Sequence, residues 1–321
     1  MINNIELGRR IAAKRKDIAL TQSQLADALH VTPQAVSRWE TGAGAPSTEI
    51  LLSMSELFHI SMNELIADDL TLDRISQKPF VKKDIAFYIP DKEYAPEWAQ
   101  RMEDQNWVME NWESYKPNPI VSREVKELAM TEGLILEIGV GPGGGYVPEF
   151  LRYNPSARII LSDLSPTVLR EWKHFLEGTL GYTHLLYAAL NHCHLPFVDG
   201  SISVVSDGGG LNNTILGTRQ EAVKEIYRVL ETGGKLITGL AYISKAEEET
   251  LPRELRDRLK DEMPWVFETL YDELTAAGFQ QIRTYVTGGW DTTDDESELA
   301  DLARYYHTNI HLTASLRICT K

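Results

Sequence analysis

Strand-like and helix-like segments alternate from residue 133 to residue 241, and this alternation limits the possible folds more than any other feature of the chain. The strand-like segments are residues 133–138, 158–163, 184–190, 202–207 and 235–241, and helical patterns lie between them at 147–154, 166–178 and 218–230. Such alternation predicts a parallel sheet with helices on both faces, a doubly wound α/β domain. Ligands of these sheets bind beyond the carboxyl ends of the strands.

The first of these strands runs into a glycine-rich stretch, "LEIGVGPGGG", at residues 136–145. A buried strand followed by so many glycines predicts a turn where backbone comes close to a ligand. The spacing fits the dinucleotide pattern GxGxxG and also the pattern ExGxGxG, which begins at Glu137. A carboxylate beside the turn suits a cationic group and disfavours a pyrophosphate. We therefore expect S-adenosyl-L-methionine and not a nicotinamide dinucleotide.

The end of the next predicted strand agrees with that expectation. Asp163 ends the strand in "IILSDLSP" and is placed to accept hydrogen bonds from ribose hydroxyls, with Leu164 beside it for an adenine face. In order and spacing, these segments resemble the class I S-adenosylmethionine-dependent methyltransferases, especially the small-molecule branch, over residues 120–321. The resemblance implies a Rossmann-like fold and assigns cofactor binding to Glu137, Gly139, Gly141, Gly143, Asp163, Leu164, Leu190, Asn191 and Ser206.

Asn191 departs from that family, which usually has an acid at this position. Its amide oxygen can still accept a hydrogen bond from an adenine amino group. Near the C-terminus, "AAGFQQIRTYV" and "TASLRICTK" resemble the closing antiparallel strands of the same fold.

Catalytic residues cannot be assigned by motif, because methyl transfer from a sulfonium needs no acid and no obligatory base. The candidates for deprotonating an acceptor are His192 and Asp207, with Ser206, Asn212 and His194 nearby; for the histidines a loop role is the alternative. Residues that could line an acceptor pocket are Trp290, Tyr305, Tyr306 and His307. No spacing of cysteine and histidine predicts a metal site.

The N-terminal part has a different pattern, "TQSQLADALHVTPQAVSRWETG", in which Thr21 and Thr32 can cap two consecutive short helices. Residues 5–67 resemble the XRE family, the lambda-repressor and Cro type of helix-turn-helix proteins. The resemblance implies that the second helix enters the major groove of double-stranded DNA and that a homodimer binds the operator. It assigns DNA contacts to Gln22, Thr32, Gln34, Ala35, Ser37 and Arg38. His30 stands where the family usually has a left-handed glycine, so we expect local strain there.

The sequence therefore predicts an all-α helix-turn-helix bundle followed by an α/β doubly wound Rossmann-like methyltransferase domain. We expect a DNA-binding domain at residues 1–67, a linker at 68–84, an aromatic-rich lid at 85–119 that would cover the ligand site or pack on its surface, and the methyltransferase domain at 120–321. The function predicted is a DNA-binding regulator that methylates a small molecule; the alternative is a regulator that only senses S-adenosyl-L-methionine or another ligand.

The distribution of charge and the number of cysteines limit the expected methyl acceptor and cellular compartment. Residues 1–67 hold 6 Lys/Arg and 7 Asp/Glu, so nearly all of the net charge of −15 belongs to the remainder, which argues against a nucleic acid as methyl acceptor. Cys193 and Cys319 cannot make a disulfide framework. With neither a signal-peptide pattern nor a long apolar run, we expect a cytoplasmic protein without a membrane association.

Overall fold

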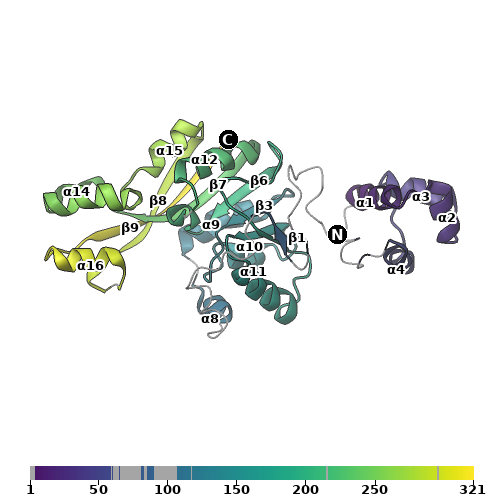
Figure 1. The fold of residues 1–321 in the computed structure, drawn as a ribbon, viewed down its shortest axis with the longest axis horizontal. Helices are drawn as coiled ribbons and strands as arrows, with labels where there is room; N and C mark the ends of the chain where they lie inside the picture. Colours follow the sequence, from purple (N-terminus) through teal and green to yellow (C-terminus); the bar gives the residue numbers. More distant parts are fainter. Residues whose placement is uncertain are drawn as a thin grey trace. The chain divides into compact units, whose positions relative to one another are not determined.

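The computed structural model describes residues 4–58, 60, 65, 81–82, 85–89, 107–116, 118–214, 216–294 and 296–321. The chain divides into two compact units, Met1–Thr71 and Leu72–Lys321. Figure 1 shows the helices of the first unit and the sheet of the second.

The first unit consists of short helices around a small apolar core. They are α1 (Asn4–Asp17), α2 (Gln22–Ala28), α3 (Pro33–Glu40) and α4 (Thr48–Leu57). Thr21 and Gln24 form a capping box at the start of α2, and Thr32 caps α3, in which Pro33 is the first residue. The core contains Leu7, Ile11, Leu25, Ala26, Leu29, Val36, Trp39, Leu51, Met54 and Phe58. The predicted helix-turn-helix bundle is thus confirmed.

The second unit is built on one nine-stranded sheet in the order β1-β2-β5-β4-β3-β6-β7-β9-β8. Its strands are β1 (Val81–Lys82), β2 (Ala86–Phe87), β3 (Ile135–Ile138), β4 (Ile159–Asp163), β5 (Leu186–Ala189), β6 (Ile202–Asp207), β7 (Leu230–Tyr242), β8 (Gln280–Asp291) and β9 (His311–Thr320). Neighbours from β2 to β7 pair in parallel, whereas β9 pairs antiparallel with β7 and β8. The predicted α/β fold, including its antiparallel close, is confirmed.

Helices cover both faces of this sheet. They are α8 (Trp107–Ser114), α9 (Pro119–Ala129), α10 (Val147–Tyr153), α11 (Pro166–Lys173), α12 (Arg219–Val229), α13 (Lys245–Thr250), α14 (Arg253–Glu262), α15 (Leu270–Ala277) and α16 (Glu298–Tyr305). Every residue of β3, β4 and β6 is buried, as in a parallel sheet covered on both sides. The main core joins one sheet face to α9, α10 and α11, and α12 packs against α15 elsewhere on the sheet.

A second, smaller core lies where the long strands β7, β8 and β9 extend past the others. In Figure 1, α14 and α16 flank this extension. Their apolar faces, with Leu255, Leu259, Leu299 and Leu302, pack together with Ile243 from the end of β7.

Several boundaries differ from the sequence expectations. The helix expected at 166–178 is α11 followed by a π-helical turn, His174–Thr179. Residues 81–82 and 86–87, expected as linker and lid, form the edge strands β1 and β2, because the run from Ile85 to Ile89 buries its apolar side chains in the main core. The rest of the expected linker, and residues 90–106 of the expected lid, lie outside the described residues.

Both cysteines are unpaired and buried. Burial raises the pKa of the Cys193 thiol to about 11 and that of the Cys319 thiol to about 12. Neither thiol is therefore ionised to a useful extent at neutral pH.

Candidate functional site

The turn between β3 and α10 shows why so many glycines follow one strand. Gly139, Gly141, Gly144 and Gly145 all have positive φ angles, of +59°, +49°, +79° and +53°. A Cβ on Gly139 would lie 2.9 Å from the Cα of Gly210, so two backbone segments are in contact there. At its glycines the loop thus presents backbone to the space above the sheet, and Val140 and Pro142 add the only side chains of residues 139–145 on that cavity wall.

Glu137 lies behind this loop and not on the wall of a cavity. It is fully buried, and one carboxylate oxygen accepts a short hydrogen bond from Ser206 Oγ. Its Oε1 has no hydrogen bond of standard geometry among the described residues. Burial raises the pKa of Glu137 to about 8, although the amides of Tyr146 and Gly208 lie near enough to counteract part of the rise.

Gly145, which is on the cavity wall, lies directly against that carboxylate. A Cβ on Gly145 would lie 1.8 Å from Glu137 Oε1, closer than atoms can approach. The carboxylate is therefore packed against the backbone of Gly145, at a position where only a residue without a side chain fits.

Asp163 ends β4 at the opposite side of the loop. Its Oδ2 accepts from the amide of Gly141 at 2.9 Å, and its Oδ1 accepts from the amide of Ser165 at 2.8 Å. Burial raises the pKa of this carboxyl group, and the two amides work against the rise. Each oxygen keeps a second lone pair for a ligand hydroxyl, and Leu164 lies next to it on the same cavity wall.

The segment after β5 adds Leu190, Asn191 and His192. The amide group of Asn191 is already used on both sides, because its Oδ1 accepts from the Cys193 amide at 2.9 Å and its Nδ2 donates to the Leu216 carbonyl at 3.1 Å. His192 Nε2 lies 3.0 Å from Thr214 Oγ1. Burial lowers the pKa of His192 to about 4, so its ring is neutral at pH 7.

Asp207, the other candidate base, lies inside the fold. It is fully buried and accepts hydrogen bonds from Thr238 Oγ1 at 2.6 Å and from the amides of Gly209 and Leu211 at 3.1 Å. These bonds fix the short 3-10 turn Gly210–Asn213 that follows β6. Asp207 and Ser206 therefore shape the site from behind and do not line it.

These elements enclose a cavity of about 750 Å³ beyond the carboxyl ends of β3, β4, β5 and β6. Of the residues expected to bind cofactor, it brings together Gly139, Gly141, Gly143, Asp163, Leu164, Leu190 and Asn191. Its further wall residues had not been assigned to cofactor binding: Trp107, Gly208–Gly210, Asn212, Thr214 and Trp265. Trp107 belongs to the expected aromatic-rich lid and Asn212 was named beside the catalytic candidates, and the repeated glycines of "SDGGG" were the signal for Gly208–Gly210.

Trp107 comes from α8, which is tied to the glycine loop. Asn111 Nδ2 donates to the Pro142 carbonyl at 3.0 Å. Trp112 packs edge-on against Trp172, whose ring nitrogen donates to the Gly141 carbonyl at 2.7 Å. The described part of the aromatic segment thus covers the loop at one side of the cavity.

S-adenosyl-L-methionine fits this arrangement. The volume suits a nucleoside-sized ligand, Asp163 offers acceptor lone pairs, and the buried Glu137 carboxylate lies behind the glycine loop, with Oε1 lacking a hydrogen bond of standard geometry. Within the described ranges, no three His, Cys, Asp or Glu side chains gather closely enough to hold a metal ion. Among those residues, too, no helix is long and apolar enough to cross a membrane.

In the first unit, α3 carries the expected base-reading residues. Gln34 and Arg38 are exposed, Ala35 and Ser37 are half-buried, and Thr32 caps the helix by accepting the Ala35 amide at 3.2 Å. The expected left-handed residue before α3 is confirmed, since His30 has φ +53°.

A buried ion pair fixes α3 against the helices before it. Arg15 donates to both oxygens of Glu40 at 2.6 and 3.0 Å, and Gln22 Nε2 donates to Glu40 at 2.8 Å. Gln22, which was expected to contact DNA, thus makes a contact within the unit.

Comparison with known proteins gives two separate matches. The helix-turn-helix family model matches residues 11–65, and the methyltransferase-domain model matches residues 136–238. The HTH-type transcriptional activator BcrR of Enterococcus faecalis is 33% identical over 81 residues, which cover 25% of this chain and 40% of that protein. The ubiquinone/menaquinone biosynthesis C-methyltransferase UbiE of Haemophilus ducreyi is 29% identical over 98 residues, 30% of this chain and 37% of that protein.

The chain therefore spans about two fifths of the length of each of these curated relatives. Among solved structures, Haemonchus contortus phosphoethanolamine N-methyltransferase 2 in complex with S-adenosyl-L-methionine aligns with 70% of this chain and 60% of its own, at 14% identity and a TM-score of 0.47.

Proposed function

We propose that this chain, which joins a helix-turn-helix domain of the XRE type to a methyltransferase domain, is a DNA-binding regulator that transfers a methyl group from S-adenosyl-L-methionine to a small molecule. The observation that carries the proposal is the cavity at the strand ends, where Asp163 and the glycine loop converge, with the Glu137 carboxylate packed behind that loop.

Each group of the cavity has a role in holding that cofactor. Asp163 would accept hydrogen bonds from ribose hydroxyls, Leu164 and Leu190 would contact the adenine faces, and Glu137 would face the ammonium group across Gly145. When bound, the cofactor supplies an electrophilic methyl group to a nucleophilic atom of the acceptor, leaving a neutral thioether, while the acceptor proton passes to solvent.

Catalysis in this site rests on positioning. Asp163 and His192 are the only titratable side chains among the described residues of the cavity wall. With a pKa of about 4, His192 is a weak base at neutral pH, but its neutral ring can orient a hydroxyl or amine. Holding two reactants in line supplies a large part of the rate without a strong base.

A calorimetric titration of S-adenosyl-L-methionine into the full chain tests the cofactor assignment. We expect micromolar binding that Asp163→Ala weakens by at least tenfold and that Asp301→Ala, an exposed acid on α16, leaves unchanged. Thermal unfolding of both variants controls for misfolding. Equal affinity in the folded Asp163→Ala variant would contradict the assignment.

DNA binding is tested with operator fragments selected from random duplex sequence. Replacing Gln34 or Arg38 by alanine should reduce specific affinity, each by about 1–3 kcal/mol if it reads a base edge, whereas Glu49→Ala on α4 should not. A loss confined to nonspecific, salt-sensitive binding would instead place these side chains on phosphates.

Sensing without catalysis is the second candidate, because the cavity wall has no strong base and both sides of the Asn191 amide are occupied. In that case the cofactor should change operator affinity, and operator DNA should change cofactor affinity by the same factor. Identical operator binding with and without cofactor would reject the sensing role.

A further inference from the structure

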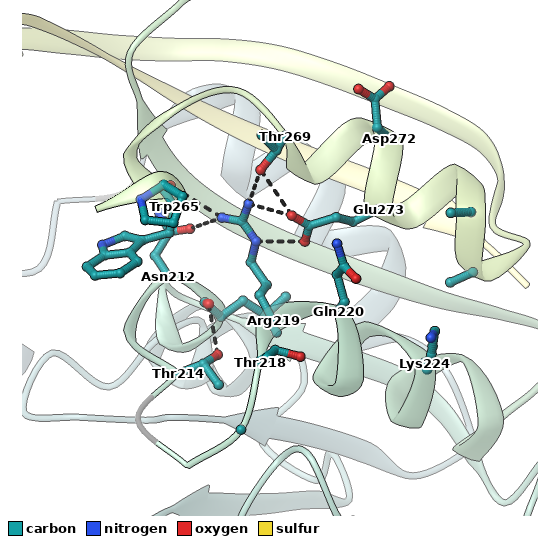
Figure 2. A pocket seen from close by; sticks show the side chains of 15 residues that line it. Asn212, Thr214, Thr218, Arg219, Gln220, Lys224, Trp265, Thr269, Asp272 and Glu273 are labelled. Carbon is teal, nitrogen blue, oxygen red and sulfur yellow. Dashed lines mark hydrogen bonds and ion pairs between the residues drawn. The ribbon is translucent and has the colours of Figure 1, made fainter. Parts of the chain in front are cut away.

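A second cavity, of about 1020 Å³, lies between the first turns of α12 and the helix α15. Figure 2 shows it, with Gln220 and Lys224 of α12 on one side and Thr269, Asp272 and Glu273 on the other. It shares three wall residues, Asn212, Thr214 and Trp265, with the cofactor cavity. The two cavities are therefore neighbours across these side chains.

The shared wall is held in place by one buried guanidinium group. Arg219 pairs with both carboxylate oxygens of Glu273 at 2.8 Å and donates to Asn212 Oδ1 at 3.0 Å and to the Trp265 carbonyl at 3.4 Å. Figure 2 shows these bonds converging on Arg219, together with a short one to Thr269. A single side chain thus fixes two of the three residues that separate the cavities.

Trp265 itself is unusual, because 44% of its surface is exposed although it lies in a turn between two helices. It belongs to the 3-10 turn Pro264–Val266, where its neighbour Val266 joins the small core and its own ring does not. Trp265 is a wall residue of both cavities. An indole face in this position offers a flat apolar surface for a planar ring.

The charges around the second cavity balance. Arg219 is neutralised by Glu273, and the remaining titratable side chains on its wall are Lys224 and Asp272, one of each sign. At the shared wall, Asn212 also donates to the Ala241 carbonyl, and Thr214 is engaged with His192 and the Leu211 carbonyl. None of the three shared wall residues is charged, so nothing at that wall would neutralise a charged ligand; Lys224 and Asp272 lie on α12 and α15.

We propose that this second cavity is the methyl-acceptor site and that it takes an uncharged molecule with a planar aromatic ring, which stacks on Trp265 and directs its nucleophilic atom across Thr214 toward the cofactor cavity. The acceptor role rests on the proposed function, but occupancy of the cavity by an aromatic ring does not. Trp290, Tyr305, Tyr306 and His307, expected from the sequence to line an acceptor pocket, lie on neither of the two cavities.

Equilibrium dialysis of the full chain against three probes tests the inference. The probes are 2-naphthol, the anionic 2-naphthalenesulfonate and the non-aromatic trans-2-decalol, each with and without saturating S-adenosylhomocysteine. The variants are Trp265→Ala, Trp265→Phe and Trp290→Ala; Trp290 is a matched control because it is also 44% exposed and lies outside both cavities.

We expect 2-naphthol to bind best, with S-adenosylhomocysteine bound at the same time. Trp265→Ala should weaken 2-naphthol binding by on the order of tenfold, Trp265→Phe should restore most of it, and Trp290→Ala should match the original protein. Equal binding by Trp265→Ala, equal binding of the other two probes, or displacement of 2-naphthol by S-adenosylhomocysteine would overturn the inference.

The two proposals fail separately. S-adenosylhomocysteine is titrated alone into the same samples. If it does not bind while 2-naphthol does so through Trp265, the cofactor proposal is lost and the aromatic site stands. If it binds while 2-naphthol does not, the cofactor proposal stands and the second cavity is not the site of an aromatic acceptor.

Discussion

Replacing Gly145 with alanine tests whether the glycine loop is dictated by the carboxylate behind it. An alanine at this position would have to adopt a left-handed backbone conformation, at φ +53°, which costs about 1–2 kcal/mol. It would also lie 1.8 Å from Glu137 Oε1, so the carboxylate has to move away from Ser206 Oγ. Disturbing that buried hydrogen bond adds about 1–3 kcal/mol.

We therefore expect Gly145→Ala to destabilise the second unit by about 3 kcal/mol, which lowers its Tm by about 6–12 °C. Gly143→Ala is the matched control, because a Cβ there meets no atom within 4 Å. It should change stability by less than about 0.5 kcal/mol. Differential scanning calorimetry of the full chain separates the transition of this unit from that of the helical unit.

A double-mutant cycle assigns the cause. In a Glu137→Ala background the obstructing carboxylate is gone, so Gly145→Ala should cost only the free energy of the left-handed backbone conformation. The coupling energy between the two substitutions should therefore exceed about 1 kcal/mol. The reasoning is refuted if Gly145→Ala costs the same with and without the Glu137 carboxylate, or if it costs no more than Gly143→Ala.

Other predictions follow from the same structure. His30→Gly should stabilise the helical unit by up to about 1 kcal/mol in chemical denaturation, since glycine adopts φ +53° without the backbone strain of histidine. A loss of stability would contradict the inference that His30 is strained. The pKa of Glu137 in the folded chain, about 8, is above the ordinary 4.5, so its contribution to the free energy of unfolding should be complete below pH 4.5 and lost as the pH rises to about 8. Glu137→Gln should abolish this pH dependence of stability in the cofactor-free chain. The pKa of His192 in the folded chain, about 4, is below the ordinary 6.5, so this residue should lower the free energy of unfolding as the pH falls from 6.5 to 4. A His192→Gln variant with the same pH dependence of stability would refute this. Arg219→Met should cost about 3 kcal/mol because it removes the positive partner of the largely buried Glu273 carboxylate, and adding Glu273→Leu should recover part of this loss in urea unfolding.

The sequence predicted the cavity wall best where a residue follows directly on a parallel strand. Asp163 is the last residue of β4 and Asn191 comes shortly after β5, and the carboxyl ends of parallel strands meet at one edge of the sheet. Their position therefore depends only on recognising the strands. The capped helices of the first unit are equally local, because Thr21 and Thr32 contact amides within three residues.

The sequence did not predict whether a side chain at a strand end lines the cavity or lies buried under the loop. Glu137 and Ser206 are paired neighbours in β3 and β6, and their side chains bond each other under the loop. Alternation along a strand tells which residues share a face, but not whether a loop closes over that face. Trp265 was missed for another reason: its place depends on Arg219, 46 positions away, which holds its carbonyl.

The buried cysteines have a practical consequence for spectroscopy. Maleimides and other thiol reagents attack the thiolate, and the two native thiols are both inaccessible and un-ionised at neutral pH. A cysteine placed on the exposed face of α4 and another on α16 would therefore carry a fluorophore pair with little background labelling and without first removing Cys193 and Cys319. The separation of the two units could then be followed by energy transfer in solution as cofactor or DNA is added.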